Sequence, residues 1–296
     1  MLNYNYIRSI GWYFLSISSC AFCDVLSKLL SDSFSELQII SMRYFFGILV
    51  LLPVLFVKNN IYAKNCLCYI RTKNVVYIEI LKAVLFVIAS FLWIKGISIS
   101  SITCATIFAF TIPLFTTLFA FIFLKEKIKL IRVITISIVF TLLIIVWFSS
   151  DVFDIGVTYF MVSIIFFSLI DILNKKVLSN GDNRSFSILF CSSCSAIAFS
   201  LPISLCINFK LPDIQALGLF FILGLCGSLV LFCFLKAIEK IDITAVLPYR
   251  YFEIVISATM DYFIFGNIID KKVLLYGFCI LPPLVIMNLF ESKSFS

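Results

Sequence analysis

The chain has 296 residues, of which 62% are hydrophobic and 13% are charged, with a mean hydropathy of +1.13. Soluble domains carry about 25% charged residues, because polar groups must cover their surface. The composition therefore excludes a water-soluble enzyme and predicts a polytopic membrane protein. The absence of histidine excludes histidine-ligated zinc and histidine general bases.

The net charge of +7 does not indicate a nucleic-acid partner, because the basic residues are dispersed between apolar blocks and form no basic stripe. Most of the 11 cysteines lie inside these blocks. The Cys20-x-x-Cys23 and Cys191-x-x-Cys194 spacings resemble metal motifs, but they have no neighbouring histidine or polar loop. We therefore interpret these cysteines as packing residues and expect no metal or other cofactor.

Apolar runs of about 20 residues, the length that crosses a bilayer core, predict an all-α membrane protein with ten transmembrane helices. The first run contains Asp24 and Lys28, which favours a retained helix over a cleaved signal peptide. The ten segments are approximately 9–29, 36–57, 75–94, 102–124, 130–148, 154–174, 186–207, 214–235, 243–265 and 273–290.

Basic residues near helix ends predict the orientation in the membrane, because they are retained on the cytoplasmic side. With the N-terminus inside, 15 of the 23 lysines and arginines fall in inner loops and four in outer loops. We therefore expect a multi-pass protein of a bacterial inner membrane with both termini in the cytoplasm.

An internal repeat is visible in the sequence. Asp24-Val-Leu-Ser-Lys28 matches Asp171-Ile-Leu-Asn-Lys175, and Lys95-Gly-Ile matches Lys236-Ala-Ile. The matches predict two five-helix repeats, at 9–148 and 154–290, that together make one transport domain. Because five is odd, the second repeat enters the membrane from the opposite side, which gives the inverted 5+5 arrangement of many secondary transporters.

Several charges lie within the predicted helices, where each needs a partner or a hydrated cavity. Asp24 and Lys28 share a helix face, as do Asp171 and Lys175. Two interpretations stay open: these are structural ion pairs, or they act in gating between the two halves.

The segment 243–265 places Arg250, Glu253, Ser257 and Asp261 along one helix face, which cannot face lipid. Pro248 removes a backbone hydrogen bond and predicts a kink before this face. Pro113 predicts a kink in the corresponding helix of the first repeat. We expect Arg250 to bind a substrate carboxylate and Glu253 to face an ammonium group. The structural alternative is that the two side chains only pair with each other.

Further candidate contacts come from aromatic and basic residues. Tyr249, Tyr251 and Trp93 offer aromatic faces for a cation or a flat base, although the position of Trp93 also suits an interfacial anchor. Arg43 stands alone in an apolar stretch and is a site candidate. Glu79 and Lys82, three residues apart, are expected to pair with each other.

Together, Pro113-Leu-Phe-Thr-Thr-Leu-Phe-Ala-Phe-Ile-Phe-Leu-Lys-Glu126 and the ten-helix inverted pattern resemble the EamA-type branch of the drug/metabolite transporter superfamily over essentially the whole chain. The sequences Cys23-Asp-Val-Leu-Ser-Lys28, Ile170-Asp-Ile-Leu-Asn-Lys-Lys176 and Pro248-Tyr-Arg-Tyr-Phe-Glu-Ile-Val-Ile-Ser257 are similar to the S-adenosylmethionine uptake group found in obligate intracellular bacteria.

The resemblance implies import of S-adenosylmethionine in exchange for S-adenosylhomocysteine, by alternating access. The alternative within the superfamily is a general exporter of amines or metabolites. An intramembrane enzyme is disfavoured, because no nucleophile and base are paired in a loop, and a structural scaffold would not need Arg250 or the kinked helices. The expected partners are a small-molecule substrate and the lipid bilayer, and the sequence leaves the oligomeric state, the coupling ion and the role of Asp261 undetermined.

Overall fold

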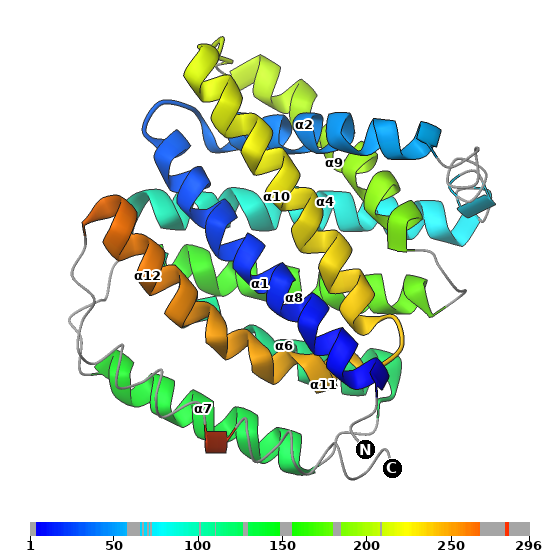
Figure 1. The fold of residues 1–296 in the computed structure, drawn as a ribbon, viewed down its shortest axis with the longest axis vertical. Helices are drawn as coiled ribbons and strands as arrows, with labels where there is room; N and C mark the ends of the chain where they lie inside the picture. Colours follow the sequence, from blue (N-terminus) through cyan, green and yellow to red (C-terminus); the bar gives the residue numbers. More distant parts are fainter. Residues whose placement is uncertain are drawn as a thin grey trace.

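The computed structural model describes residues 4–57, 66, 68–69, 71, 73–100, 102–109, 111–126, 130–148, 156–179, 185–207, 209–266 and 282–283. Within these ranges the chain forms helices and no strands (Figure 1). The prediction of an all-α protein is therefore confirmed for the described part of the chain.

Helices cover the first nine predicted segments. The first half contains α1 (Tyr4–Ser31), α2 (Glu36–Val57), α4 (Lys73–Ile99), α5 (Ile102–Ala109), α6 (Ile112–Phe119), the π-helix η1 (Ala120–Leu124) and α7 (Leu130–Phe148). The second half contains α8 (Gly156–Leu178), α9 (Ser185–Ile207), α10 (Ile214–Ile238), α11 (Ile243–Val246), the 3-10 helix η2 (Leu247–Phe252) and α12 (Glu253–Phe265). The tenth predicted segment, 273–290, lies outside the described residues apart from 282–283.

Five of these helices, α1, α2, α4, α9 and α10, are long and apolar enough to cross a membrane. Two shorter apolar helical stretches, Ile112–Leu124 and Val255–Phe265, add to them. Because a bilayer core of about 30 Å needs about 20 apolar residues per helix, the chain is a multi-pass membrane protein.

Two proline-containing segments interrupt their helices. Between α5 and α6 the helix breaks, and Pro113 lies in the first turn of α6. Between α11 and α12 the backbone forms the 3-10 helix η2, with Pro248 in its first turn. Proline has no amide hydrogen and its ring clashes with the carbonyl four residues earlier, which favours an interruption at both positions. The break before α12 places Arg250 in η2 and Glu253 at the start of the following helix.

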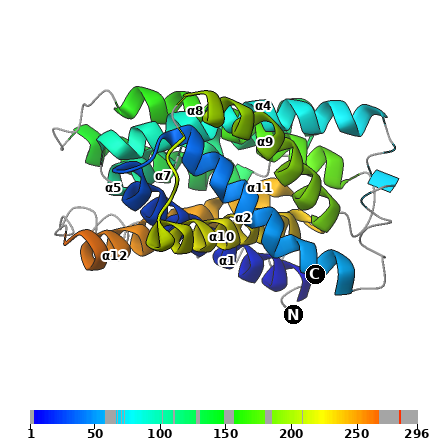
Figure 2. The same ribbon diagram turned by 90° about the horizontal axis from the view of Figure 1, so that it is seen from above.

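The helices form two layers. Figure 2 shows α4, α8 and α9 in one layer and α1, α10 and α12 in the other, with α2 crossing beside them. The most extensive helix contacts join α1 with α10 and α4 with α8, and α2 packs against both α9 and α10. Where α2 meets α10, Gly47 and Gly224 allow their backbones to approach closely.

Candidate functional site

A cavity of about 170 Å³ lies between the two layers. Because about 10–15 Å³ is enough to hold one water molecule, the space is large enough for a small metabolite together with water. Helices α1, α2, α4, α8, α9 and α10 and the 3-10 helix η2 supply polar or charged side chains to its wall. These side chains are Tyr13, Ser16, Cys20, Cys23, Asp24, Ser27, Arg43, Tyr44, Lys82, Ser90, Trp93, Asp171, Asn174, Ser192, Ser193, Ser228 and Arg250.

Asp24 of α1 lies on the cavity wall, where the Trp93 Nε1–H donates a hydrogen bond to its Oδ1 at 3.0 Å. Lys28 does not pair with it. Its Nζ instead donates to the Ser100 backbone carbonyl at 3.3 Å, and it lies 5.2 Å from the ring centroid of Phe265. The local Asp24–Lys28 ion pair of the sequence interpretation is therefore not formed. The reason is tertiary: the negative C-terminal end of α4 supplies a partner for the ammonium group.

Asp171 and Lys175 of α8 likewise form no ion pair with each other but have different surroundings. The Nζ of Lys175 donates to the backbone carbonyls of Ile238 and Ile241 at the end of α10, both at 2.7 Å. Asp171, one helical turn earlier, lines the cavity and forms no ion pair with Lys175. In both halves of the chain, therefore, the lysine donates hydrogen bonds to carbonyls at the end of another helix, and the aspartate lines the cavity.

Arg250 lines the cavity from η2, and its Nε lies 3.3 Å from Oε2 of Glu253. The side chain of Glu253 is only 3% exposed and is not among the residues that line the cavity. The pair is thus an internal ion pair with its positive end at the wall. The two side chains therefore pair, as the structural alternative predicts, and Arg250 also reaches the cavity wall. Binding of a substrate by either side chain stays a prediction.

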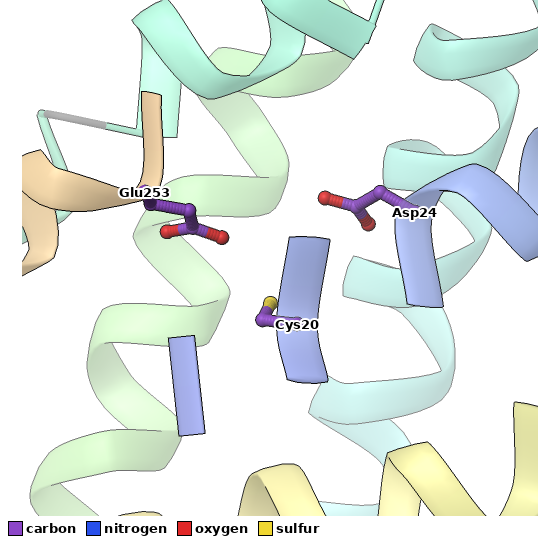
Figure 3. A group of neighbouring side chains, drawn as sticks. All are labelled: Cys20, Asp24 and Glu253. Atoms are coloured by element: carbon purple, nitrogen blue, oxygen red, sulfur yellow. The ribbon is translucent and has the colours of Figure 1, made fainter. Parts of the chain in front are cut away.

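A carboxylate cluster stands beside this pair. One possible ligand atom from each of Cys20, Asp24 and Glu253 lies within 4.8 Å of the others. Figure 3 shows the carboxyl groups of Asp24 and Glu253 pointing toward each other from opposite sides of the Cys20 thiol. Arg250 pairs with Glu253, whereas Asp24 forms no ion pair within the described residues and is the carboxyl group of the cluster that lines the cavity.

Arg43 of α2 supplies a positive charge to the cavity wall. Its guanidinium lies 6.0 Å from the ring centroid of Phe86, and it fills the space left by the missing side chain of Gly227. No carboxylate of the described residues forms an ion pair with it. Since guanidinium binds carboxylates through two parallel hydrogen bonds, Arg43 is better placed than the paired Arg250 to hold an anionic group.

The aromatic residues divide between the cavity and the core. Trp93 lines the cavity, is 9% exposed and meets Phe160 edge to face, so it is not an exposed interfacial anchor. Tyr249 is buried in the core, where its hydroxyl lies 3.3 Å from that of Tyr6. Tyr249 is therefore a packing residue, which corrects the expectation that its ring faces a substrate.

The structure does not describe the side chains of Tyr251 and Asp261, although both belong to described helices. The sequence interpretation missed other aromatic residues of the cavity, namely Tyr13, Tyr44, Phe86, Phe167 and Phe234. With 34 phenylalanines in the chain, no local signal separates those that line a cavity from those that face lipid or the core.

A second buried ion pair joins Lys82 and Glu79 of α4 at 2.7 Å, as the sequence predicts. Glu79 also accepts hydrogen bonds from Ser192 of α9 at 2.7 Å and from the Tyr69 hydroxyl. This network links α4 to α9. Lys82 lines the cavity, but Glu79 neutralises its charge.

Comparison with known proteins adds independent findings. The EamA-like transporter family matches residues 7–148 and 154–289. Three curated relatives are each named S-adenosylmethionine uptake transporter. That of Rickettsia bellii (strain RML369-C) is 37% identical over 98% of this chain and 97% of its own length. Those of Rickettsia felis (strain ATCC VR-1525 / URRWXCal2) and Rickettsia prowazekii (strain Madrid E) are 35% and 33% identical, over 98% of this chain and 96% of their own lengths.

A solved crystal structure has the same fold, with a TM-score of 0.71 over 98% of this chain and 99% of the other. At 11% identity, this similarity bears on the fold alone.

Proposed function

We propose that this chain, which belongs to the EamA-like transporter family, is a transporter for the uptake of S-adenosylmethionine and not an enzyme. The observation that carries the proposal is a cavity whose wall holds both acidic and basic side chains, in a chain that is similar over nearly its full length to transporters named for this substrate.

The substrate carries a carboxylate, an ammonium, a sulfonium and an adenine, so a binding site needs both charge signs and flat apolar surfaces. Arg43 is the proposed partner of the carboxylate. Asp24 and Asp171 are the proposed partners of the two cationic groups, and Phe86 and Trp93 offer surfaces for the adenine or the sulfonium. In this assignment Arg250 and Glu253 hold their positions as an internal pair.

For the transport cycle, we propose ten helices in two inverted five-helix repeats, 9–148 and 154–290, that rock about the cavity. The contacts between helices support this arrangement. In such an arrangement α8 corresponds to α1, and α10 corresponds to α4. The contact between α1 and α10 then corresponds to the contact between α8 and α4. These two helix contacts are the most extensive in the described part of the chain. Likewise, α6 packs on α8 as α12 packs on α1.

The proposal extends to location and exchange. The excess of lysine and arginine in alternate loops favours a bacterial inner membrane with both termini in the cytoplasm. S-adenosylhomocysteine, the product of methyl transfer, keeps the carboxylate, the ammonium and the adenine, so the same cavity suits it as the exchanged substrate.

Uptake of radiolabelled S-adenosylmethionine into cells that express the chain tests the proposal. We expect uptake above that of empty-vector cells, and a loss of at least tenfold in Arg43→Ala. Arg8→Ala, at an exposed arginine of α1, is the matched control and should keep normal uptake. Uptake equal to that of empty-vector cells, at normal protein levels, would rule out the importer and favour an exporter of the same family.

A further inference from the structure

The two aspartates of the cavity have different surroundings, and the two cations of the proposed substrate have different chemistry. An ammonium group has three N–H donors and requires acceptors. A sulfonium has no donor, so only negative charge and polarisable surface recognise it. This difference allows each aspartate to be matched to one cation, on the basis of the proposed function.

Asp171 lies in a hydrogen-bonding environment. Asn174, three residues later on α8, lines the same cavity and is 2% exposed. Its Oδ1 accepts no hydrogen bond from the part of the chain that the structure describes. A buried acceptor without a donor is costly, and an ammonium group that donates to Asp171 and Asn174 would remove this cost.

Asp24 lies in an aromatic and acidic environment. Oδ1 already accepts the indole N–H of Trp93, which fixes the orientation of the carboxylate. The Trp93 ring lies on the cavity wall, and Glu253 and Cys20 stand within 4.8 Å of Asp24 (Figure 3). Glu253 is paired with Arg250, whereas Asp24 forms no ion pair within the described residues, so a bound cation without donors can supply its counter-charge.

We propose that Asp24, oriented by Trp93, binds the sulfonium and makes the transporter prefer S-adenosylmethionine to S-adenosylhomocysteine. Asp171 and Asn174 bind the ammonium that both molecules share. Loss of the methyl group leaves an uncharged thioether. The Asp24 carboxylate therefore has a counter-ion when S-adenosylmethionine is bound and none when S-adenosylhomocysteine is bound.

The test is equilibrium binding of each molecule to the purified full chain in detergent. We expect Asp24→Asn, which keeps the acceptor for Trp93, to raise the Kd for S-adenosylmethionine at least tenfold, equivalent to about 1.4 kcal/mol. The Kd for S-adenosylhomocysteine should change less than twofold. Asp171→Asn is the matched control and should weaken both molecules by similar factors. Trp93→Phe, which loses the N–H, should reduce the preference about threefold.

The outcomes separate the two levels of the argument. If the unaltered chain binds S-adenosylmethionine but Asp24→Asn weakens both molecules equally, or neither, the assignment of Asp24 is overturned. Retained binding of S-adenosylhomocysteine by Asp24→Asn shows at the same time that this variant is folded. If the unaltered chain binds neither molecule, the proposed function itself fails.

Discussion

Alanine substitutions at three glycines of α10 distinguish an effect on helix packing from an effect on substrate binding. A Cβ at Gly224 would lie 2.6–2.8 Å from atoms of Phe46 and the backbone of Gly47 on α2. At Gly227 the obstacle is a side chain, with the Cζ of Arg43 3.1 Å away. At Gly218 a Cβ meets nothing within 4 Å. The three sites share one helix, so helix propensity changes equally in all three variants.

The expected magnitude for Gly224→Ala follows from these distances. Carbon atoms pack at about 3.5–4.0 Å, so α2 and α10 must separate by about 0.8 Å, because the obstructing atoms include backbone. Overpacking of this kind costs about 1–3 kcal/mol of unfolding free energy, a decrease of several °C in Tm for a chain of this size. Gly218→Ala should keep the Tm of the unaltered chain or exceed it.

Gly227→Ala should weaken substrate binding and leave the unfolding free energy nearly unchanged, because the flexible Arg43 side chain can move aside more easily than a backbone can. The displaced guanidinium would leave its position over Phe86, and we expect the Kd for S-adenosylmethionine to rise about tenfold with little change in Tm. Thermal unfolding in detergent, monitored by size-exclusion chromatography, and ligand binding measure the two effects. Equal Tm values for Gly224→Ala and Gly218→Ala would refute the packing argument, and unchanged affinity in Gly227→Ala would refute the role of Arg43.

Three further perturbations test the polar network. Lys175→Met leaves two backbone carbonyls at the end of α10 without their donor and should lower the unfolding free energy by about 1–3 kcal/mol. The Tm is compared with that of the exposed control Lys176→Met, and equal Tm values would contradict this expectation. Lys82→Met leaves Glu79 as an uncompensated buried charge and should cost about 3–5 kcal/mol, part of which the double variant with Glu79→Leu should restore. In a chain whose other cysteines are replaced, bound S-adenosylmethionine should slow alkylation of Cys20 by a thiol reagent; an unchanged rate would place the substrate elsewhere.

Sequence reasoning located nine of the predicted helical segments and two proline breaks, because both signals are local. A run of about 20 apolar residues cannot be solvated except by lipid or protein, wherever it lies in the fold. Pro113 and Pro248 disturb a helix through their own rings and missing amide hydrogens, which act within one helical turn. Whether a helix breaks also depends on its surroundings, because α2 and α9 continue through Pro53 and Pro202. The presence of charged residues inside such helices likewise indicated a polar site in the membrane.

The partners of those charges could not be predicted in the same way. Helical spacing brings Asp24 and Lys28 to one face, yet it contains no information about Trp93 or the end of α4, which the fold brings to them. The spacing of Arg250 and Glu253 allowed their contact, which the sequence analysis kept as the structural alternative and which the structure shows.

The sequence by itself therefore determined which segments are apolar helices, where they break and which charges they carry. Only the tertiary structure decided that Asp24, Arg43 and Asp171 face one cavity while Tyr249 is packed in the core. The physical reason is that hydropathy and helix geometry depend on neighbours a few residues apart, whereas the environment of an ionised side chain depends on helices that are distant in the chain.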